Sequence, residues 1–273
     1  MGKKLYIEAG AGISGDMTVA MLLDLGADPE VLESVLKTVP ADGFEIKISR
    51  VKKAGLDCCD FDVILEEDNH DHDMEYLYGH MHDHEHHHDH DHEHHHHHHG
   101  HHHVHRGLPE IQEIINGTQM SDRAKTIANR IFEVIAEAEA EAHGIPLTDV
   151  HFHEVGAVDS IVDVISIAVC LDNLDITDVI VPYLTEGTGT VRCQHGIIPV
   201  PVPAVVNIVK NHAIGLKLSG AMGEHVTPTG AAVVAAIRTS DTLPEVVTIE
   251  KAGLGAGKRD YEQPGILRGF IIR

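Results

Sequence analysis

The residues best suited to bind a metal ion lie between positions 151 and 163, where His151, His153 and Glu154 precede Asp159 and Asp163. If the first three residues are extended, the two imidazoles point to the same side, because side chains alternate along a strand. The two aspartates are four residues apart at the expected start of a helix, so they share a face near its positive end. Imidazole and carboxylate suit a borderline divalent ion such as Ni(II), Zn(II), Fe(II) or Co(II). The alternative is that Asp159 only caps the helix while the histidines form local hydrogen bonds.

A second concentration of possible ligands is the histidine tract from His70 to His105. Twenty of the 26 histidines lie there, and the stretch 66–105 also has 11 carboxylates and no Lys or Arg. Flexible imidazoles bind several ions loosely, without a fixed coordination geometry. Segment 68–106 has too little apolar surface to offset the entropy of ordering it, so we expect a disordered insertion. The ligands for such accessory metal ions would include His86, His88, His95 and His97.

A glycine-rich loop from Gly10 to Gly15 has the pattern GxGxxG between a predicted strand and a predicted helix. This context is typical of a dinucleotide-binding fingerprint. Asp16, however, places a carboxylate where a pyrophosphate would meet the helix N-terminus, which disfavours phosphate. We therefore favour a loop that presents Ser14 and Asp16 to a substrate, with an ordinary tight turn as the alternative, and predict that the loop does not bind NAD.

Two groups near the C-terminus could hold an anion. Thr227 and Thr229 stand at the start of a predicted helix, and Lys258 and Arg259 follow a second glycine-rich run. Helix starts and glycine amides both bind anions, and basic side chains add charge. The alternative is a helix cap and a flexible turn. Anion binding is favoured if Arg192 joins the two basic residues in one pocket.

Cys193 and His195 are two residues apart and could face one ion or one substrate, although ordinary packing explains the pair equally well. Four cysteines without a CxxC pair are too few to crosslink a chain of 273 residues, so we expect reduced thiols.

Hydrophobic periodicity predicts interspersed strands and helices, and therefore a mixed α/β (α+β) fold. Segments 1–67 and 107–273 are expected to pack as one domain. The predicted strands are 5–8, 44–48, 61–65, 179–183, 246–250 and 267–272. The predicted helices are 17–25, 29–36, 111–115, 121–144, 160–174, 205–210 and 230–238.

The charge balance points to a cation as the partner. The formal net charge is -23, with 43 acidic and 20 basic residues. This argues against proteins that bind nucleic acid or anionic membranes. The sequence also lacks an uncharged run of the roughly 20 residues that a membrane span requires, so we expect a cytoplasmic protein.

In combination these motifs resemble the nickel insertion proteins that complete the nickel-pincer cofactor of lactate racemase, the pyridinium-3,5-bisthiocarboxylic acid mononucleotide nickel chelatases. The matching segments are 12–17, 151–163, 195–203, 227–232 and 255–268. His225 departs from the family pattern, which usually has an apolar residue there.

The resemblance implies insertion of Ni(II) into an organic mononucleotide, with a carbon–nickel bond flanked by two thiocarboxylate sulfurs. It implies that longer members use CTP, with Mg or Mn, through a C-terminal part that could be a separate subunit here. Glu154 is our first candidate for the general base and Asp16 the second. Ser14, His195, Thr227, Thr229, Lys258 and Arg259 would bind the substrate. Two other functions stay open, a nickel store or metallochaperone and a dinucleotide oxidoreductase, as does a homo-oligomeric state.

Overall fold

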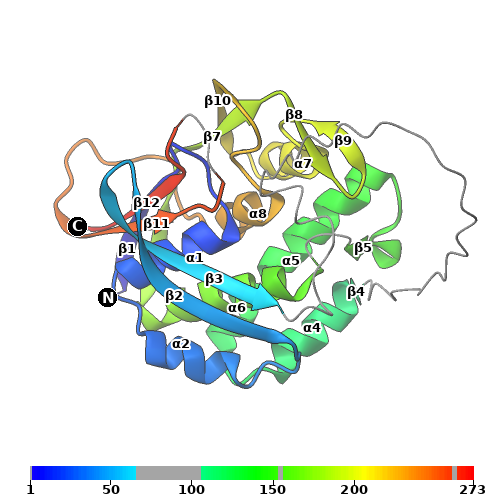
Figure 1. Ribbon diagram of the computed structural model, residues 1–273, viewed down its shortest axis with the longest axis horizontal. Helices are drawn as coiled ribbons and strands as arrows, with labels where there is room; N and C mark the ends of the chain where they lie inside the picture. Colours follow the sequence, from blue (N-terminus) through cyan, green and yellow to red (C-terminus); the bar gives the residue numbers. More distant parts are fainter. Residues whose placement is uncertain (1, 66–105, 153–155, 260–262) are drawn as a thin grey trace, which may run out of the picture.

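A mixed six-stranded sheet takes strands from both ends of the chain (Figure 1). The computed structural model describes residues 2–65, 106–152, 156–259 and 263–273. The strand order is β2-β3-β11-β12-β1-β6, with β1 parallel to β6 and antiparallel to β12. Segments on both sides of the histidine tract therefore share one sheet. The strands are β1 (Lys3–Glu8), β2 (Phe44–Lys53), β3 (Leu56–Leu65), β6 (Ile176–Ile180), β11 (Ile249–Ala256) and β12 (Ile266–Ile272).

Helices cover this sheet and form the rest of the core. In Figure 1, α1 lies on the sheet, and β3 passes in front of α1 and α6, both of which it contacts. The long helix α5 packs against α6, α7 and α8. The helices are α1 (Gly15–Asp24), α2 (Pro29–Leu36), α4 (Leu108–Gly117), α5 (Asp122–His143), α6 (Val158–Asn173), α7 (Pro203–Asn211) and α8 (Pro228–Ile237). The mixed α/β fold predicted from the sequence is confirmed.

Smaller strands form the upper part of the molecule in Figure 1, where β7 and β10 pair in parallel and β8 and β9 form a hairpin. A two-residue pairing joins β4 to β5. Their bounds are β4 (Arg106–Gly107), β5 (His151–Phe152), β7 (Tyr183–Thr188), β8 (Thr190–Cys193), β9 (Gly196–Pro199) and β10 (Gly215–Met222), with a short 3-10 helix at Leu147–Asp149. Our sequence analysis missed β4, β8, β9 and β10, and all of β7 beyond Tyr183.

Capping residues fix the ends of α5 as the sequence predicts. The hydroxyl of Ser121 accepts a hydrogen bond from the Ala124 amide at 3.0 Å. Gly144 adopts a left-handed conformation, with φ of 65°, at the C-terminal cap. Such caps satisfy backbone groups that have no partner within the helix.

The glycine-rich run 253–257 is not a loop, because most of it belongs to β11. A Cβ atom at Gly255 would lie 2.0 Å from the Met17 carbonyl oxygen, and one at Gly253 would lie 2.6 Å from the Met21 carbonyl oxygen. These glycines therefore let α1 approach the sheet closely. The predicted strand 246–250 is wrong in its bounds, since β11 begins at Ile249. The predicted strand 179–183 is also wrong in its bounds, since the structure ends β6 at 180 and begins β7 at 183.

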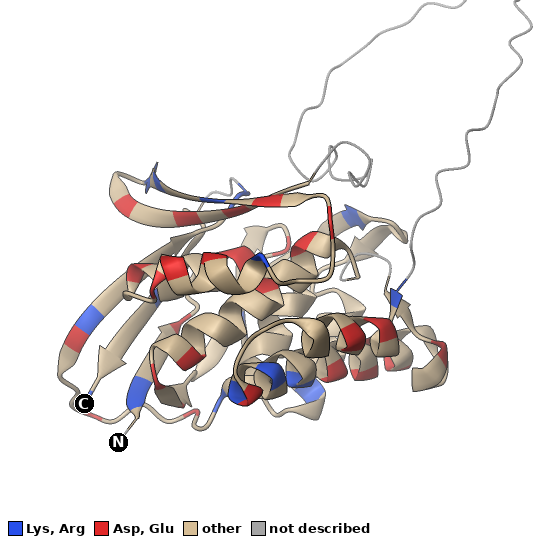
Figure 2. Cartoon of the chain, turned by 90° about the horizontal axis from the view of Figure 1, so that it is seen from below, with Lys and Arg blue, Asp and Glu red and all other residues tan. Residues whose placement is uncertain are grey.

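Acidic residues outnumber basic ones over the part of the chain drawn in colour in Figure 2. No helix among the described residues is both long and apolar enough to cross a membrane.

Candidate functional site

A cavity of about 1010 Å³ opens where several elements meet. The end of β3, the first turns of α1, α6 and α8, and the β8–β9 hairpin all contribute to its walls. Its lining includes nine of the residues predicted to act in chemistry or binding: Ser14, Asp16, Asp159, Asp163, His195, Thr227, Thr229, Lys258 and Arg259. Distant parts of the sequence therefore converge on one cavity.

Asp16 and Asp163 form the acidic centre of the cavity. Asp16 lies in the first turn of α1, where it accepts a hydrogen bond from the Ser14 hydroxyl. Asp163 lies on α6, close to the backbone of Gly15. Its Oδ1 atom is buried and accepts no hydrogen bond from any residue that the structure describes. A buried carboxylate oxygen without a donor is costly, so this atom is available to a cation or a proton.

Burial raises the pKa of both carboxyl groups. For Asp163 the pKa is raised well above its ordinary value by burial and by the charges of Asp16 and Asp159. For Asp16 burial raises the pKa, although the hydrogen bond from Ser14 and the charge of Lys258 oppose the shift. A carboxylate with a raised pKa holds a proton more readily, as a general base requires.

Lys258 supplies positive charge beside these acids. Its Nζ atom lies 3.3 Å from Asp60 and 3.0 Å from Asp62, both on β3. Burial alone would lower the pKa of Lys258, but the hydrogen bond to Asp62 and the charge of Asp60 raise it above its ordinary value. Our sequence analysis missed Asp60 and Asp62. The available signal was their spacing of two within a strand, which places both on one face.

A buried carboxylate orders the loop before α8. Glu186, which has no exposed surface, accepts hydrogen bonds through Oε1 from the amides of Gly187, His225 and Val226 at 2.7, 2.7 and 3.1 Å. In the same loop Glu224 forms an ion pair with Arg259 at 2.7 Å. Burial raises the pKa of Glu186 despite these hydrogen bonds. No local pattern of residues around Glu186 predicts this role.

The α8 threonines have different surroundings. The Thr227 hydroxyl accepts a hydrogen bond from the Gly230 amide at 3.1 Å, so it caps the helix. Thr229 is buried. Both Thr229 and Arg192 line the cavity. The convergence of Arg192 with Lys258 and Arg259 on one pocket, which the sequence analysis treated as the test for an anion site, is present.

One rim of the cavity carries sulfur and imidazole. Cys193 Sγ lies 3.9 Å from His195 Nδ1 at the tip of the β8–β9 hairpin. The ring of His195 lies against the ring of His143 at the end of α5, with 5.0 Å between the centroids. His143 in turn lies 3.4 Å from the carboxylate of Glu139.

The predicted metal ligands are only partly brought together. Asp159 and Asp163 line the cavity, whereas His151 is exposed on β5 and does not line it. His153 and Glu154 lie outside the described residues, as do His86, His88, His95 and His97. Among the residues that the structure describes, no three His, Cys, Asp or Glu side chains lie close enough together to hold a metal ion.

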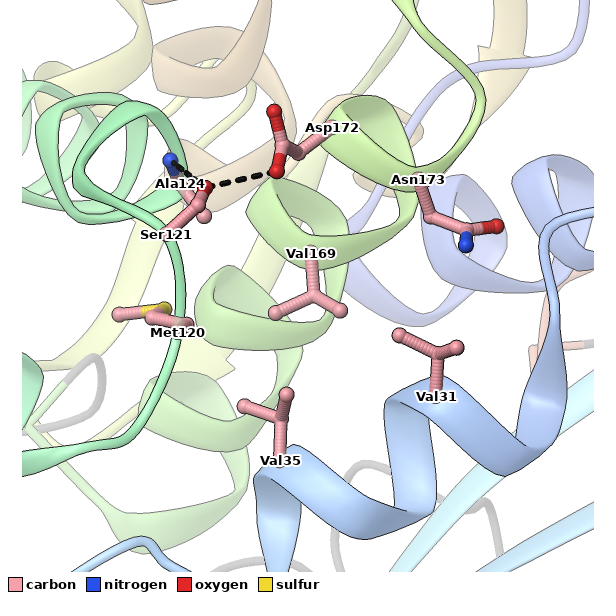
Figure 3. A pocket seen from close by; sticks show the side chains of 8 residues that line it. All are labelled: Val31, Val35, Met120, Ser121, Ala124, Val169, Asp172 and Asn173. Carbon is pink, nitrogen blue, oxygen red and sulfur yellow. Dashed lines mark hydrogen bonds between the residues drawn. The ribbon is translucent and has the colours of Figure 1, made fainter.

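A second cavity of about 180 Å³ lies between α2, α5 and α6 (Figure 3). Valine side chains form much of its wall, and the polar groups are used in local structure. Ser121 donates to Asp172 at 2.6 Å while it caps α5. We therefore place the chemistry in the larger cavity.

An α/β domain whose cavity is lined by several carboxylates and by basic side chains has the chemical groups to bind a cation together with an anionic small molecule. The chain belongs to the nickel insertion protein family, which matches residues 5–273. A pyridinium-3,5-bisthiocarboxylic acid mononucleotide nickel insertion protein of Alkaliphilus metalliredigens is 52% identical over 273 residues, which are 100% of this chain and 61% of the relative.

Proteins with the same name in Clostridium acetobutylicum and Clostridium kluyveri are 44% and 42% identical. Each alignment covers 98% of this chain, and 63% and 62% of the respective relative. The chain thus spans less than two thirds of the length of these relatives. No solved structure matches the chain.

Proposed function

We propose that this chain inserts Ni(II) into pyridinium-3,5-bisthiocarboxylic acid mononucleotide to form the nickel-pincer cofactor. The observation that carries the proposal is one cavity whose wall contains both the carboxylates of Asp16 and Asp163 and the cations of Lys258 and Arg259. Its volume of about 1010 Å³ is sufficient for a mononucleotide. The relatives bear the name of this reaction.

The cavity divides the binding task between charges of opposite sign. Asp159 and Asp163, which line the cavity, would hold the nickel ion there, and His153 stays our predicted histidine ligand, whereas His151 lies outside the cavity lining. Arg192, Lys258 and Arg259 would neutralise the phosphate and thiocarboxylate groups, and arginine is well suited to such planar anions. Ser14, Thr227 and Thr229 would position the substrate by hydrogen bonds, and His195 would contact it from the hairpin.

Metallation of the pyridinium ring requires a proton acceptor. The carbon–nickel bond forms as the ring C–H bond breaks, so the proton passes to a base while the electron pair stays on carbon. Glu154 is our first candidate and Asp16 our second. The burial of Asp16, its raised pKa and its orientation by Ser14 support a role as base.

A direct assay tests the proposal. The purified chain is incubated with the mononucleotide precursor and Ni(II), and the product is followed by mass spectrometry and absorbance. Because the family resemblance implies CTP with Mg or Mn through a C-terminal part, parallel reactions receive CTP, either metal and that part of a relative. Transfer of the product to lactate racemase would then activate the racemase. Absence of the nickel-containing mass under all these conditions would reject the proposal.

A nickel store or metallochaperone is the second candidate, because 20 histidines lie between His70 and His105. A store would keep its function when Asp163 is replaced, whereas an insertion enzyme would not.

The hypothesis of a dinucleotide-binding oxidoreductase has less support. Gly12 and Gly15 of the Gly10–Gly15 loop serve protein packing, since a Cβ atom at Gly12 would lie 2.1 Å from the His225 carbonyl oxygen and one at Gly15 would lie 2.5 Å from Asp163 Oδ2.

A further inference from the structure

We propose that Cys193 and His195 form the initial binding site for Ni(II), from which the ion passes to the acidic centre of the same cavity. The two residues occupy the tip of a tight hairpin, where Cys193 pairs with Gly196 across a two-residue turn. Gly196 has a φ of 91°, a conformation that favours glycine and stabilises such turns. The hairpin therefore presents sulfur and imidazole side by side on a defined support.

The distance between the two ligand atoms is close to that of a shared metal ion. A borderline divalent ion lies about 2.3 Å from a thiolate sulfur and about 2.1 Å from an imidazole nitrogen, which separates these atoms by roughly 3.1–3.6 Å at angles of 90–109°. The observed separation of Cys193 Sγ and His195 Nδ1 is 3.9 Å. A closure of a few tenths of an ångström, within reach of one side-chain rotation, brings both atoms onto one ion.

Two neighbouring residues support this arrangement from α5. The ring of His143 packs beside that of His195, with 5.0 Å between the centroids, and the Glu139 carboxylate lies 3.4 Å from His143. Glu139 therefore orients His143, and His143 limits the space open to the ring of His195. Thiolate and imidazole together favour Ni(II), Co(II), Cu(I) or Zn(II) over Mg(II) or Ca(II).

A site with two protein ligands suits transfer rather than storage. The remaining coordination positions are open to water or to the thiocarboxylate sulfurs of the incoming substrate. Cys193 and His195 line the same cavity as Asp16 and Asp163, so the ion need not leave the protein on its way inward. The delivery step rests on the proposed function, whereas metal binding at the hairpin does not.

Cobalt(II) titration of the full chain tests the binding site, because thiolate-to-cobalt charge transfer gives a near-ultraviolet band that imidazole and carboxylate ligands do not produce. The histidine tract contains no cysteine, so any cobalt that it binds leaves this band unchanged. Cys58, Cys59 and Cys170 are buried, whereas Cys193 is partly exposed. We expect one thiolate-bearing site per chain, with a band that excess Ni(II) displaces.

Variants assign the band. C193S should abolish it, and H195A should weaken cobalt binding at this site at least tenfold. C58A is the matched cysteine control and Q194A the matched hairpin control, and both should retain the wild-type band. Circular dichroism checks that each variant is folded. A missing band in the wild-type chain, or an unchanged band in C193S, would overturn the assignment.

Insertion assays at limiting nickel test delivery separately. In C193S the nickel concentration for half-maximal insertion should rise at least tenfold, while the precursor concentration for half-maximal rate should change less than twofold. An unchanged nickel requirement would overturn the delivery role. If the wild-type chain shows the cobalt band but no insertion under any condition, the proposed function fails while the metal site stands.

Discussion

The carboxylate of Asp163 lies directly against the backbone of Gly15, so a methyl group at Gly15 would come within 2.5 Å of Asp163 Oδ2. The first residue of α1 and the second turn of α6 are thereby brought into contact at the acidic centre. Glycine is required at this position for space, since its φ lies outside the left-handed region.

This contact predicts a selective loss of activity in G15A. The added methyl group should push the Asp163 carboxylate out of place, and small displacements of reacting groups cost up to about 100-fold in rate. We expect insertion to fall at least tenfold. G10A is the matched control, because a Cβ atom at Gly10 would meet no atom within 4 Å. Equal activity of G15A and G10A would contradict this role for the contact.

Replacement of Asp163 by Asn should stabilise the fold at neutral pH. The pKa of Asp163 is raised in the folded protein, so its charged form opposes folding at pH values above that folded pKa. We expect D163N to gain about 0.5–2 kcal/mol in the free energy of unfolding at pH 7. The stability gain of D163N over wild type should shrink as the pH falls, because the wild-type carboxyl then takes up a proton and no longer places an uncompensated charge in the folded protein.

Urea unfolding at several pH values measures this effect. D172N, on the same helix, provides the contrast, because Asp172 is hydrogen-bonded by Ser121 and paired with Arg123. That variant should lose stability at pH 7. A D163N protein that is less stable than wild type at pH 7 would contradict the prediction, because it would show that neighbouring groups stabilise the charged form of Asp163.

The close approach of α1 to the sheet predicts that G255A is destabilised. A Cβ atom at Gly255 would lie 2.0 Å from a backbone oxygen, which cannot move as a side chain can. Overpacking of this kind costs roughly 1–3 kcal/mol. G265A is the control, since its nearest contact would be 3.6 Å. Thermal unfolding distinguishes the two, and an unperturbed G255A would show that α1 can shift.

Local signals in the sequence were enough to predict α5, because the Ser121 side chain caps its N-terminus and Gly144 adopts the left-handed backbone conformation that ends it. The proximity of Asp16 and Asp163 has no such signal. These residues are 147 positions apart, and only the packing of α1 on α6 brings them together. Motifs nevertheless selected each one separately, since Asp16 follows the glycine-rich loop and Asp163 is four residues after Asp159 on a predicted helix.

Glycine-rich runs were the weakest guide to the site. The run 253–257 was expected to be a loop that binds anions, but Gly253 and Gly255 accommodate backbone atoms of α1. The same residue type serves anion binding and close packing, and sequence alone does not separate them. Glu186 was missed for a different reason. The amides of His225 and Val226, which donate hydrogen bonds to it, are distant in sequence, so no local motif marks it.

Lys258 should stabilise the fold through the acids around it, and this effect should depend on pH. In K258M, Asp60 and Asp62 lose a cation that lies 3.3 and 3.0 Å away, in partly buried surroundings. We expect a loss of about 1–3 kcal/mol at pH 7, since the two carboxylates keep their charge without compensation. The pKa of Lys258 is raised in the folded protein, so the loss in K258M should be full at neutral pH and should diminish at alkaline pH, where the wild-type lysine gives up its proton.

K52M is the control for this prediction, because Lys52 pairs with Asp57 at 3.1 Å where both side chains are largely exposed. Exposed pairs contribute about 0–1 kcal/mol, so little change is expected. Under the proposed function K258M should also raise the KM for the anionic precursor, while K52M should not. If K258M and K52M have the same free energy of unfolding at each pH and the same KM, Lys258 is an ordinary surface charge and does not belong to the site.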